Sequence, residues 1–281
     1  MGESRLIAIT GANGHIGSRV AARLAEHGIE QRLLVRDPST APSHQGAEVA
    51  RYGGYSDADG MVAALEGVDT VLLISAREAE DRVEQHITAV DAAATIGVER
   101  IVYLSFLGAA PVATFTFARH HFETEQYIRD SGVAFTFSRQ NLYMDLIPYL
   151  GGEEGVIQGP ANDGRVAPIA RDDVADALLP MLLDDGHAGA TYELTGGEAL
   201  TLGEIATTLT EATDSHVEFV NETVEEAYES RRRYGAPDWE VEGWVTTYTA
   251  IAAGELNVRT DHVERLTGHR PITLREFLKA E

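Results

Sequence analysis

The sequence predicts an α/β protein, in which a doubly wound parallel sheet is followed by a smaller C-terminal lobe of mixed α/β structure. Three observations lead to this fold class. Short apolar runs alternate with amphipathic segments over residues 1–140, a glycine-rich turn directly follows the first run, and the alternation loosens beyond residue 140. Strands separated by helical segments form βαβ units, whose strands are parallel and whose crossovers are right-handed.

The first region, residues 1–140, is expected to be a nucleotide-binding domain. Its strand-like runs are residues 5–10, 31–35, 48–52, 70–76, 100–105 and 134–138. Two sets of apolar residues between the runs recur at helical spacing: Ile16, Val20 and Leu24, and then Val83, Ile87 and Val90. The runs RLIAIT and TVLLISA are almost wholly apolar, as expected for central strands that helices cover on both faces.

The second region, residues 141–281, is expected to form mainly a substrate lobe. It begins with the glycine-rich segment 151–165, which separates the sheet from a mixed region. A strand at 190–195 is expected to rejoin the sheet. Helices are expected at 171–184, near 202–213 and near 222–234, and two short helices follow Tyr248. The aromatic residues of this lobe either stack on a flat substrate or form its core: Tyr143, Trp239, Trp244 and Tyr248.

Composition limits the possible partners and the possible chemistry of the protein. The 22 basic and 45 acidic residues give a net charge of −23, which argues against nucleic acid or an anionic membrane surface as a partner. No apolar run reaches the roughly 20 residues of a membrane span. The chain has no cysteine, which excludes disulfides, thiolate catalysis and cysteine-ligated metals. We expect a cytoplasmic protein, because no secretory signal opens the sequence. We expect it to be a monomer or a homodimer.

The segment TGANGHIG, residues 10–17, lies between the first strand and the first helix. Its glycines suit a phosphate-binding turn: Gly11 for the tight bend, Gly14 for close approach of a pyrophosphate, and Gly17 for packing of helix against strand. The N-terminus of the helix also offers unpaired N–H groups and the positive end of its dipole. In this position the pattern predicts a Rossmann-type dinucleotide-binding domain.

The end of the second strand bears on the choice between NADP(H) and NAD(H). The segment QRLLVRDP ends with Arg36 and Asp37. An arginine at this point can pair with a 2′-phosphate. Asp37 either forms a turn before Pro38 or accepts a hydrogen bond from the ribose. We therefore favour NADP(H) as cofactor and keep NAD(H) as the alternative.

Further segments resemble one family along nearly the whole chain, from residue 5 to near residue 277. They are VRDP, LLISA, YLSFLGA, HHFETE, SRQNLYMD, RDDVADA, YELTGG and GELNVRTDHVERLTGH. Together with TGANGHIG they resemble the NmrA-like branch of the atypical short-chain dehydrogenases/reductases. Within that branch the sequence is similar to bacterial NAD(P)H:quinone oxidoreductases of the second type and to triphenylmethane reductase. The resemblance implies an NAD(P)H-dependent oxidoreductase.

The resemblance also implies positions around the cofactor. Those expected near the phosphates are Gly11, Asn13, Gly14, His15, Ile16, Gly17 and Arg36. Those expected on the adenosine side are Tyr55, Ser75, Ala76 and Arg77, with Ser105 near the nicotinamide. Three residues that follow the sixth strand are expected to border the substrate cleft: Gln140, Asn141 and Tyr143. Relatives often have asparagine where Gln140 stands.

The superfamily's usual Tyr-x-x-x-Lys pair is missing. Phe117 and His121 stand at that spacing, and the only lysine of the chain is Lys279. A ketone becomes an alkoxide after hydride attack and needs an acid nearby. A quinone instead becomes a phenolate-like anion, whose conjugate acid has a pKa of about 10, and a triarylmethane cation becomes neutral. The expected substrate is therefore a small aromatic acceptor such as a quinone.

Three residues are candidate catalytic groups: His121, Ser105 and Tyr143. His121 either contacts the nicotinamide ribose or donates a proton to a quinone oxygen, or else it anchors its helix through Glu125. No metal is expected at His120 and His121, because adjacent helix residues point in different directions. A second hypothesis is a non-catalytic NADP(H)-binding regulator of the NmrA type that senses redox state. An isomerase or dehydratase ranks last.

Overall fold

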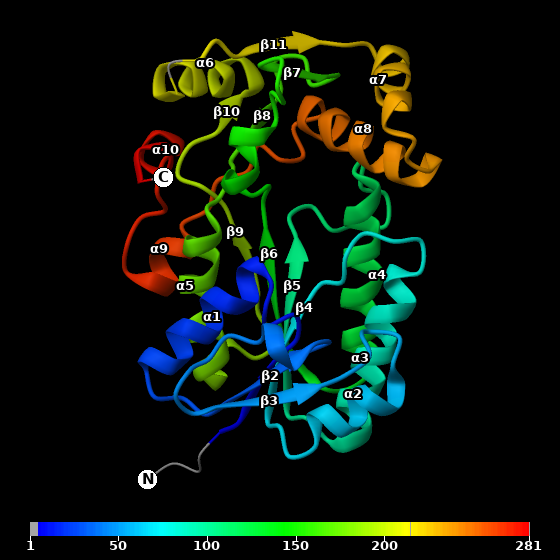
Figure 1. Ribbon diagram of the computed structural model, residues 1–281, viewed down its shortest axis with the longest axis vertical. Coiled ribbons are helices and arrows are strands. Elements are labelled where there is room, and N and C mark those ends of the chain that lie inside the picture. The colour runs from blue at the N-terminus through cyan, green and yellow to red at the C-terminus, as the bar shows by residue number, and fades with distance from the viewer. Residues whose placement is uncertain (1–4, 214, 281) are drawn as a thin grey trace. The chain divides into compact units, whose positions relative to one another are not determined.

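The computed structural model describes residues 5–213 and 215–280, and the chain divides into two compact units (Figure 1). The first unit contains the chain as far as Ser105, His120–Arg139 and Val174–Tyr192. The second contains Phe106–Arg119, Gln140–Asp173 and the chain from Glu193 onward. The sequence placed one boundary at residue 140. Segment 106–119 belongs to the second unit and segment 174–189 to the first, which in each case is not the unit expected.

The first unit is built on a sheet whose strand order is β3-β2-β1-β4-β5-β6-β9 among the described residues. Neighbouring strands from β3 to β5 pair in parallel, as the βαβ pattern predicted. The strands are β1 (Ile7–Ile9), β2 (Gln31–Val35), β3 (Ala47–Arg51), β4 (Thr70–Ile74), β5 (Arg100–Phe106), β6 (Ala134–Gln140) and β9 (Thr191–Leu194). The last of these is the strand expected to rejoin the sheet. The predicted doubly wound α/β fold is confirmed.

Helices cover both faces of this sheet, with α2, α3 and α4 on one side and α1 and α5 on the other (Figure 1). Polar contacts agree with this arrangement. Asp176 of α5 pairs with Arg23 of α1 at 2.5 Å, and Thr124 of α4 lies 2.8 Å from the His86 ring of α3. The helices are α1 (His15–Glu26), α2 (Ala58–Leu65), α3 (Arg82–Ile96), α4 (Thr116–Asp130) and α5 (Arg171–Leu183).

The core of the first unit includes one face of its central strands. Val71 and Leu73 of β4 and Ile101 and Tyr103 of β5 share one buried cluster, because alternate residues of a strand point to the same face. Helical residues such as Met61 complete it. Each such side chain contributes roughly 1.5–3 kcal/mol of burial free energy, so the cluster fixes the strand ends that carry polar residues.

The second unit combines two small sheets with helices. β7 (Val156–Gly159) pairs in parallel with β11 (Glu218–Asn221), and β8 (Arg165–Val166) pairs antiparallel with β10 (Leu200–Thr201). Its helices are α6 (Leu202–Thr213), α7 (Val224–Arg231), α8 (Asp238–Ala252), α9 (His262–Thr267) and α10 (Leu274–Ala280). Within the described part of the chain, every helix is too short or too polar to cross a membrane.

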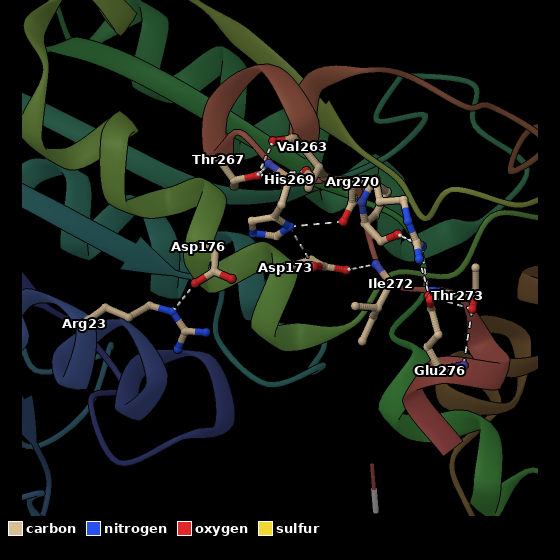
Figure 2. Close-up of polar contacts among 11 residues, drawn as sticks. Arg23, Asp173, Asp176, Val263, Thr267, His269, Arg270, Ile272, Thr273 and Glu276 are labelled. Atoms are coloured by element: carbon tan, nitrogen blue, oxygen red, sulfur yellow. Dashed lines mark hydrogen bonds and ion pairs between the residues drawn. The ribbon is translucent and has the colours of Figure 1, made fainter. Parts of the chain in front are cut away.

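Side chains satisfy backbone groups at the ends of elements in the second unit. At the start of α7, Thr223 Oγ1 accepts the N–H of Glu226, and the Glu226 carboxylate accepts the N–H of Thr223. Figure 2 shows a second case near the C-terminus, where the buried Asp173 carboxylate accepts the N–H of Ile272 at 3.0 Å. The bond to Asp173 ties the segment before α10 to the start of α5.

Candidate functional site

The glycine-rich turn between β1 and α1 is closed on itself. Gly11 has a φ of +57°, in the left-handed region that favours glycine, and its carbonyl accepts the N–H of Gly14 at 2.9 Å. A Cβ on Gly17 would lie 2.3 Å from the Gly11 oxygen, so α1 approaches the turn this closely only with glycine there. Asn13 Nδ2 donates to Thr40 Oγ1 at 2.9 Å and ties the turn to the segment after β2.

The N-terminus of α1 is free to receive an anion. Gly14 is the N-cap and offers no side chain, and the first turn contains no acidic residue. Asn13 and His15 are exposed, whereas Ile16 and Gly17 are buried on the inner face of the helix. The unpaired N–H groups and the positive end of the dipole therefore remain available. The predicted phosphate residues of the turn, 11–17, therefore lie together at this helix N-terminus.

The Asp37 side chain caps the turn after β2. Its Oδ1 accepts the N–H of Ser39 at 2.9 Å and the hydroxyl of Ser39 at 2.8 Å. The bond from the hydroxyl is the main cause that lowers the pKa of Asp37. Of the two roles that the sequence left open, this geometry favours the turn residue. Arg36 is then the charged group that remains available at the end of β2.

Three arginines form no hydrogen bond or ion pair within residues 5–213 and 215–280. Arg36 follows β2, Arg51 ends β3, and Arg77 follows β4, so they flank the turn after β1 on both sides. All three are exposed. In a chain of net charge −23, unpaired cations gathered at one edge of a sheet indicate an anionic ligand. Arg36 and Arg77 were predicted cofactor residues, and Arg51 was not.

Tyr55 links the ends of two central strands. Its hydroxyl lies 2.7 Å from Thr10 Oγ1 and also contacts the carbonyl of Ile74. The Thr10 hydroxyl in turn accepts the N–H of Ile74 at 2.9 Å. Burial is the main cause that raises the pKa of Tyr55, so this phenol stays protonated. The predicted adenosine-side residue therefore also braces the strand ends.

The segment after β4 is held from α3. The N–H of Ala76 donates to His86 Nε2 at 2.8 Å, and the carbonyl of Ala76 accepts from Arg82 Nε at 2.9 Å. Ala76 itself is buried, Ser75 is half-buried, and Arg77 is exposed. Both peptide groups that flank Ala76 thus have fixed directions. This fixes the path of the predicted cofactor segment 75–77.

His121 lies in a buried polar network on the same side of the sheet. Its Nε2 is 3.2 Å from Arg82 Nη2, and its Nδ1 is 2.9 Å from the Tyr103 hydroxyl. Because a guanidinium only donates, Nε2 is the acceptor and Nδ1 carries the proton of the neutral ring. Burial, followed by the Arg82 charge, holds the pKa of His121 well below its usual value. The ring N–H that a proton donor needs is directed at Tyr103.

His86 is neutral for the same reasons. Its Nε2 accepts the N–H of Ala76, so its proton lies on Nδ1, 2.8 Å from Thr124 Oγ1. Burial is the main cause that lowers the pKa of His86 to about 3, and the charge of Arg82 adds to it. Two neutral histidines therefore flank one buried guanidinium.

Ser105, at the carboxyl end of β5, faces α4. It is fully buried, and its hydroxyl donates to Glu125 Oε1 at 2.6 Å. The buried Glu125 carboxylate also receives two hydrogen bonds from Arg139, at 2.7 and 2.6 Å. The carboxylate thus takes up the only proton that Ser105 can donate. Glu125, the helix anchor considered for His121, is engaged by Ser105 and Arg139.

In the second unit, Phe117 occupies the position of the superfamily's tyrosine. It is 6% exposed, and its ring centroid lies 6.0 Å from that of Trp239. A Cβ on Gly243 would lie 2.4 Å from the Phe117 ring, so α8 packs directly against it. Phe117 is therefore a core residue of this unit. Trp239, one of the aromatic candidates for stacking, packs against the same core.

The other predicted residues of the second unit differ in burial and in the contacts that their side chains make. Gln140 is buried, and its Oε1 has no hydrogen-bond partner in the described structure. Asn141 is a structural residue, because its Nδ2 donates to the carbonyl of Leu256 at 3.0 Å. Tyr143 is half-buried, and the guanidinium of Arg171 lies 4.9 Å from its ring centroid. Gln140 thus keeps a buried acceptor available for a ligand.

Several polar residues near these positions were not predicted. They are Arg82, His86, Tyr103 and Arg139. A signal for the first two was present, because an arginine and a histidine four residues apart share one face of a helix. That face is also the one that carries the buried Ala89 and Val90. Tyr103 and Arg139 lie within apolar strands and give no comparable signal.

A family model described as NAD(P)H-binding matches residues 11–185. Quinone oxidoreductase 2 of Escherichia coli is 33% identical over 280 residues, which cover 96% of each chain. An NAD(P)H azoreductase of Xenophilus azovorans is 30% identical over 280 residues, which cover 98% of this chain and 97% of the relative. The predicted nicotinamide cofactor and the predicted resemblance to quinone reductases are confirmed.

The similar solved structures include two reductases and an epimerase. An NADPH-dependent quinone oxidoreductase of Escherichia coli in complex with NADPH has a TM-score of 0.88 at 31% identity, with coverage of 98% and 99%. Triphenylmethane reductase of Citrobacter in complex with NADP(H) has a TM-score of 0.86 at 29% identity, and the match covers 98% of this chain and 99% of that one. A nucleoside-diphosphate-sugar epimerase of Staphylococcus aureus has a TM-score of 0.89 at 26% identity, and the match covers 97% of this chain and 99% of that one. The transcriptional regulator NmrA, at 18% identity and a TM-score of 0.78 with coverage of 99% and 95%, shows the fold alone.

Proposed function

Since the chain belongs to the NAD(P)H-binding family and is an NAD(P)H-dependent oxidoreductase, we propose that it reduces quinones and similar electron-poor aromatic compounds with NADPH. When bound, NADPH supplies the hydride. The turn 10–17 and the N-terminus of α1 would hold its pyrophosphate. Arg36 would pair with the 2′-phosphate, and the segment 75–77 would line the adenosine side.

The observation that carries this proposal is the loss of the tyrosine–lysine pair on α4. Phe117 is a buried core residue, and His121 is neutral with its N–H directed at Tyr103. Neither residue offers the acid that an alkoxide requires within the chemical step. An acceptor that leaves as a stabilised anion or as a neutral molecule needs no such acid. Quinones and triarylmethane cations are acceptors of this kind.

Two residues would serve the acceptor itself. Gln140 keeps a buried carbonyl oxygen without a partner among the described residues, which suits an N–H or O–H donor on a ligand. Tyr143 is half-buried and offers an aromatic ring to a flat molecule. The names of the relatives, a quinone oxidoreductase and an azoreductase, support an aromatic acceptor.

The test is the oxidation of NADPH, followed by the absorbance of the reduced nicotinamide. The acceptor panel contains a benzoquinone, a naphthoquinone, an azo dye, a triarylmethane dye and an aliphatic ketone. We expect turnover with at least one aromatic acceptor and none with the ketone. Rapid reduction of the ketone, with the aromatic acceptors left unchanged, would refute the proposal.

A non-catalytic NADP(H)-binding regulator is the second candidate. The absent tyrosine–lysine pair is compatible with it, and NmrA shares the fold. Tight NADPH binding without oxidation by any member of the panel would favour this regulator. NADPH oxidation with even one acceptor, at a rate proportional to the protein concentration, would favour the reductase.

A further inference from the structure

Arg82 is a buried cation without a carboxylate. Its residue is 4% exposed, and its guanidinium forms no ion pair with any carboxylate of the described residues. Nε donates to the Ala76 carbonyl and Nη2 to His121 Nε2, while Nη1 has no partner. Arginine is rarely buried unless it is paired, because desolvation of an unpaired charge costs much more free energy than desolvation of a neutral group.

The groups around Arg82 cannot balance its charge. His86 accepts from a backbone N–H and His121 accepts from Arg82 itself, so both rings are neutral. Tyr103 donates or accepts only as a neutral phenol. The buried carboxylate of Glu125 is committed to Arg139 and Ser105. Among the described residues of the first unit, Arg82 is therefore a buried positive charge with no carboxylate paired to it.

The position of Arg82 indicates which part of a ligand it serves. Its hydrogen bonds reach the segment after β4 and, through His121, Tyr103 of β5. The pyrophosphate belongs at the turn after β1, and the adenosine ribose belongs at the end of β2. In the strand order β2-β1-β4-β5, the nicotinamide half of the cofactor extends toward β4 and β5. Arg82 thus lies on the side where hydride is transferred.

We propose that the charge of Arg82 stabilises the anionic oxygen that forms on the acceptor. This inference rests on the proposed quinone reduction. Hydride transfer oxidises NADPH to NADP⁺ and adds two electrons and one proton to the quinone, which gives the hydroquinone monoanion. A proton from solvent then completes the hydroquinone. A buried positive charge attracts this anion and repels a cationic acceptor, so Arg82 favours acceptors that become anions over those that start as cations.

Three variants separate charge from packing. Arg82→Gln removes the charge and keeps an amide that can donate to Ala76, whereas Arg82→Lys keeps the charge. Arg100→Gln is the control for the loss of a buried arginine, because Arg100 is 3% exposed, has one unpartnered nitrogen, and donates to the carbonyls of Leu182 and Asp184. Unlike Arg82, Arg100 also lies 3.6 Å from a carboxylate, that of Asp185. It opens β5 at the opposite end from Ser105.

The direct measurement is binding of para-nitrophenolate to the NADP⁺-saturated protein, with nitrobenzene as the neutral probe. We expect Arg82→Gln to weaken phenolate binding about tenfold, as the loss of a charged hydrogen-bonding partner does, and to leave nitrobenzene binding unchanged. Arg82→Lys should retain most of the phenolate affinity. The affinity for NADP⁺ should stay within about twofold of the wild type in both variants, because the pyrophosphate is bound elsewhere.

Four results would overturn the proposal. The first is a wild type that binds the phenolate no more tightly than nitrobenzene, and the second is an Arg82→Gln variant that loses equal affinity for both probes. The third is a comparable loss of phenolate affinity in Arg100→Gln. The fourth is a tenfold loss of NADP⁺ affinity in Arg82→Gln, which would make the cofactor phosphate the partner of Arg82. In turnover, Arg82→Gln should slow quinone reduction and leave reduction of a triarylmethane cation unchanged or faster. A wild type inactive toward every acceptor would contradict the proposed function, while the phenolate measurement would still decide the role of Arg82.

Discussion

A guanidinium that follows a strand and has no carboxylate partner can form two charge-assisted hydrogen bonds with a 2′-phosphate. Arg36 is such a group, and Asp37 beside it is occupied by Ser39. We predict that Arg36→Ala weakens NADPH binding by roughly 1.5–3 kcal/mol and leaves NADH binding nearly unchanged. Titration of both nucleotides measures this difference.

The matched control for Arg36 is Arg265→Ala, which removes an exposed arginine of the second unit that lies 3.8 Å from Asp261. Its affinities for both nucleotides should equal those of the wild type. Equal losses of NADPH and NADH affinity in Arg36→Ala would remove Arg36 from the 2′-phosphate site.

His86 makes the stability of the protein depend on pH. Its pKa falls from 6.5 to about 3 on folding, mainly through burial. Between these two values the unfolded chain binds a proton at His86 and the folded chain does not. Stability is complete above pH 6.5 and falls as pH decreases from there toward 3. Between about pH 7.5 and about pH 5.5, one such histidine accounts for a loss of about 1.4 kcal/mol. Denaturant unfolding at the two pH values measures the loss.

The variant His86→Gln keeps an acceptor for the N–H of Ala76 but cannot titrate. Its stability should therefore fall less than that of the wild type over the same pH interval, by about the 1.4 kcal/mol of one histidine. His216→Gln is the control, because the His216 side chain is 80% exposed. Parallel losses in the wild type and His86→Gln would contradict the neutral, buried assignment.

At the scale of single residues, the sequence named candidate positions but not the partners of their side chains. The turn 10–17 and Arg36 were predicted from local pattern, because a glycine-rich turn and a strand end are local features. Ser105 and His121 were named for their chemistry, yet Ser105 donates to Glu125 and His121 donates to Tyr103. Those partners come from another element, and a single sequence does not reveal which elements face each other.

At the scale of elements, α4 shows why the missing tyrosine is not simply replaceable. Phe117 packs against Trp239 and α8, so a hydroxyl at its ring would be buried. We predict that Phe117→Tyr with His121→Lys gives no reduction of an aliphatic ketone. The variant should also lose roughly 1–3 kcal/mol of stability, because the new hydroxyl lacks a partner. NADPH oxidation and denaturant unfolding measure the two effects. Ketone reduction by the double variant would show that α4 can still present a tyrosine to substrate.

The junction of β1 and α1 gives a second prediction for an element. Gly17→Ala places a methyl group 2.3 Å from the Gly11 carbonyl oxygen, so the helix must move away from the turn. We expect weaker NADPH binding and a loss of roughly 1–3 kcal/mol of stability, as for an overpacked core. Gly203→Ala in α6 is the control, because its new methyl group would have nothing nearer than 3.8 Å. Unchanged NADPH affinity in Gly17→Ala would show that the helix N-terminus tolerates displacement.

At the scale of the whole molecule, the alternation of strands and helices was sufficient to predict the sheet. RLIAIT and TVLLISA form neighbouring central strands, β1 and β4, because only apolar runs suit a strand covered on both faces. The division of the chain was less accessible. Segment 106–119 belongs to the second unit and segment 174–189 to the first, because packing rather than sequence order decides which unit a segment joins.

The central claim is that this NAD(P)H-dependent oxidoreductase transfers hydride without an acid from α4. It is tested most directly by comparing kcat/KM for a quinone and for an aliphatic ketone of similar size, with NADPH as donor. We predict a quinone value that exceeds the ketone value by orders of magnitude, with the ketone at the level of the reaction without protein. Comparable values for the two acceptors would contradict the claim.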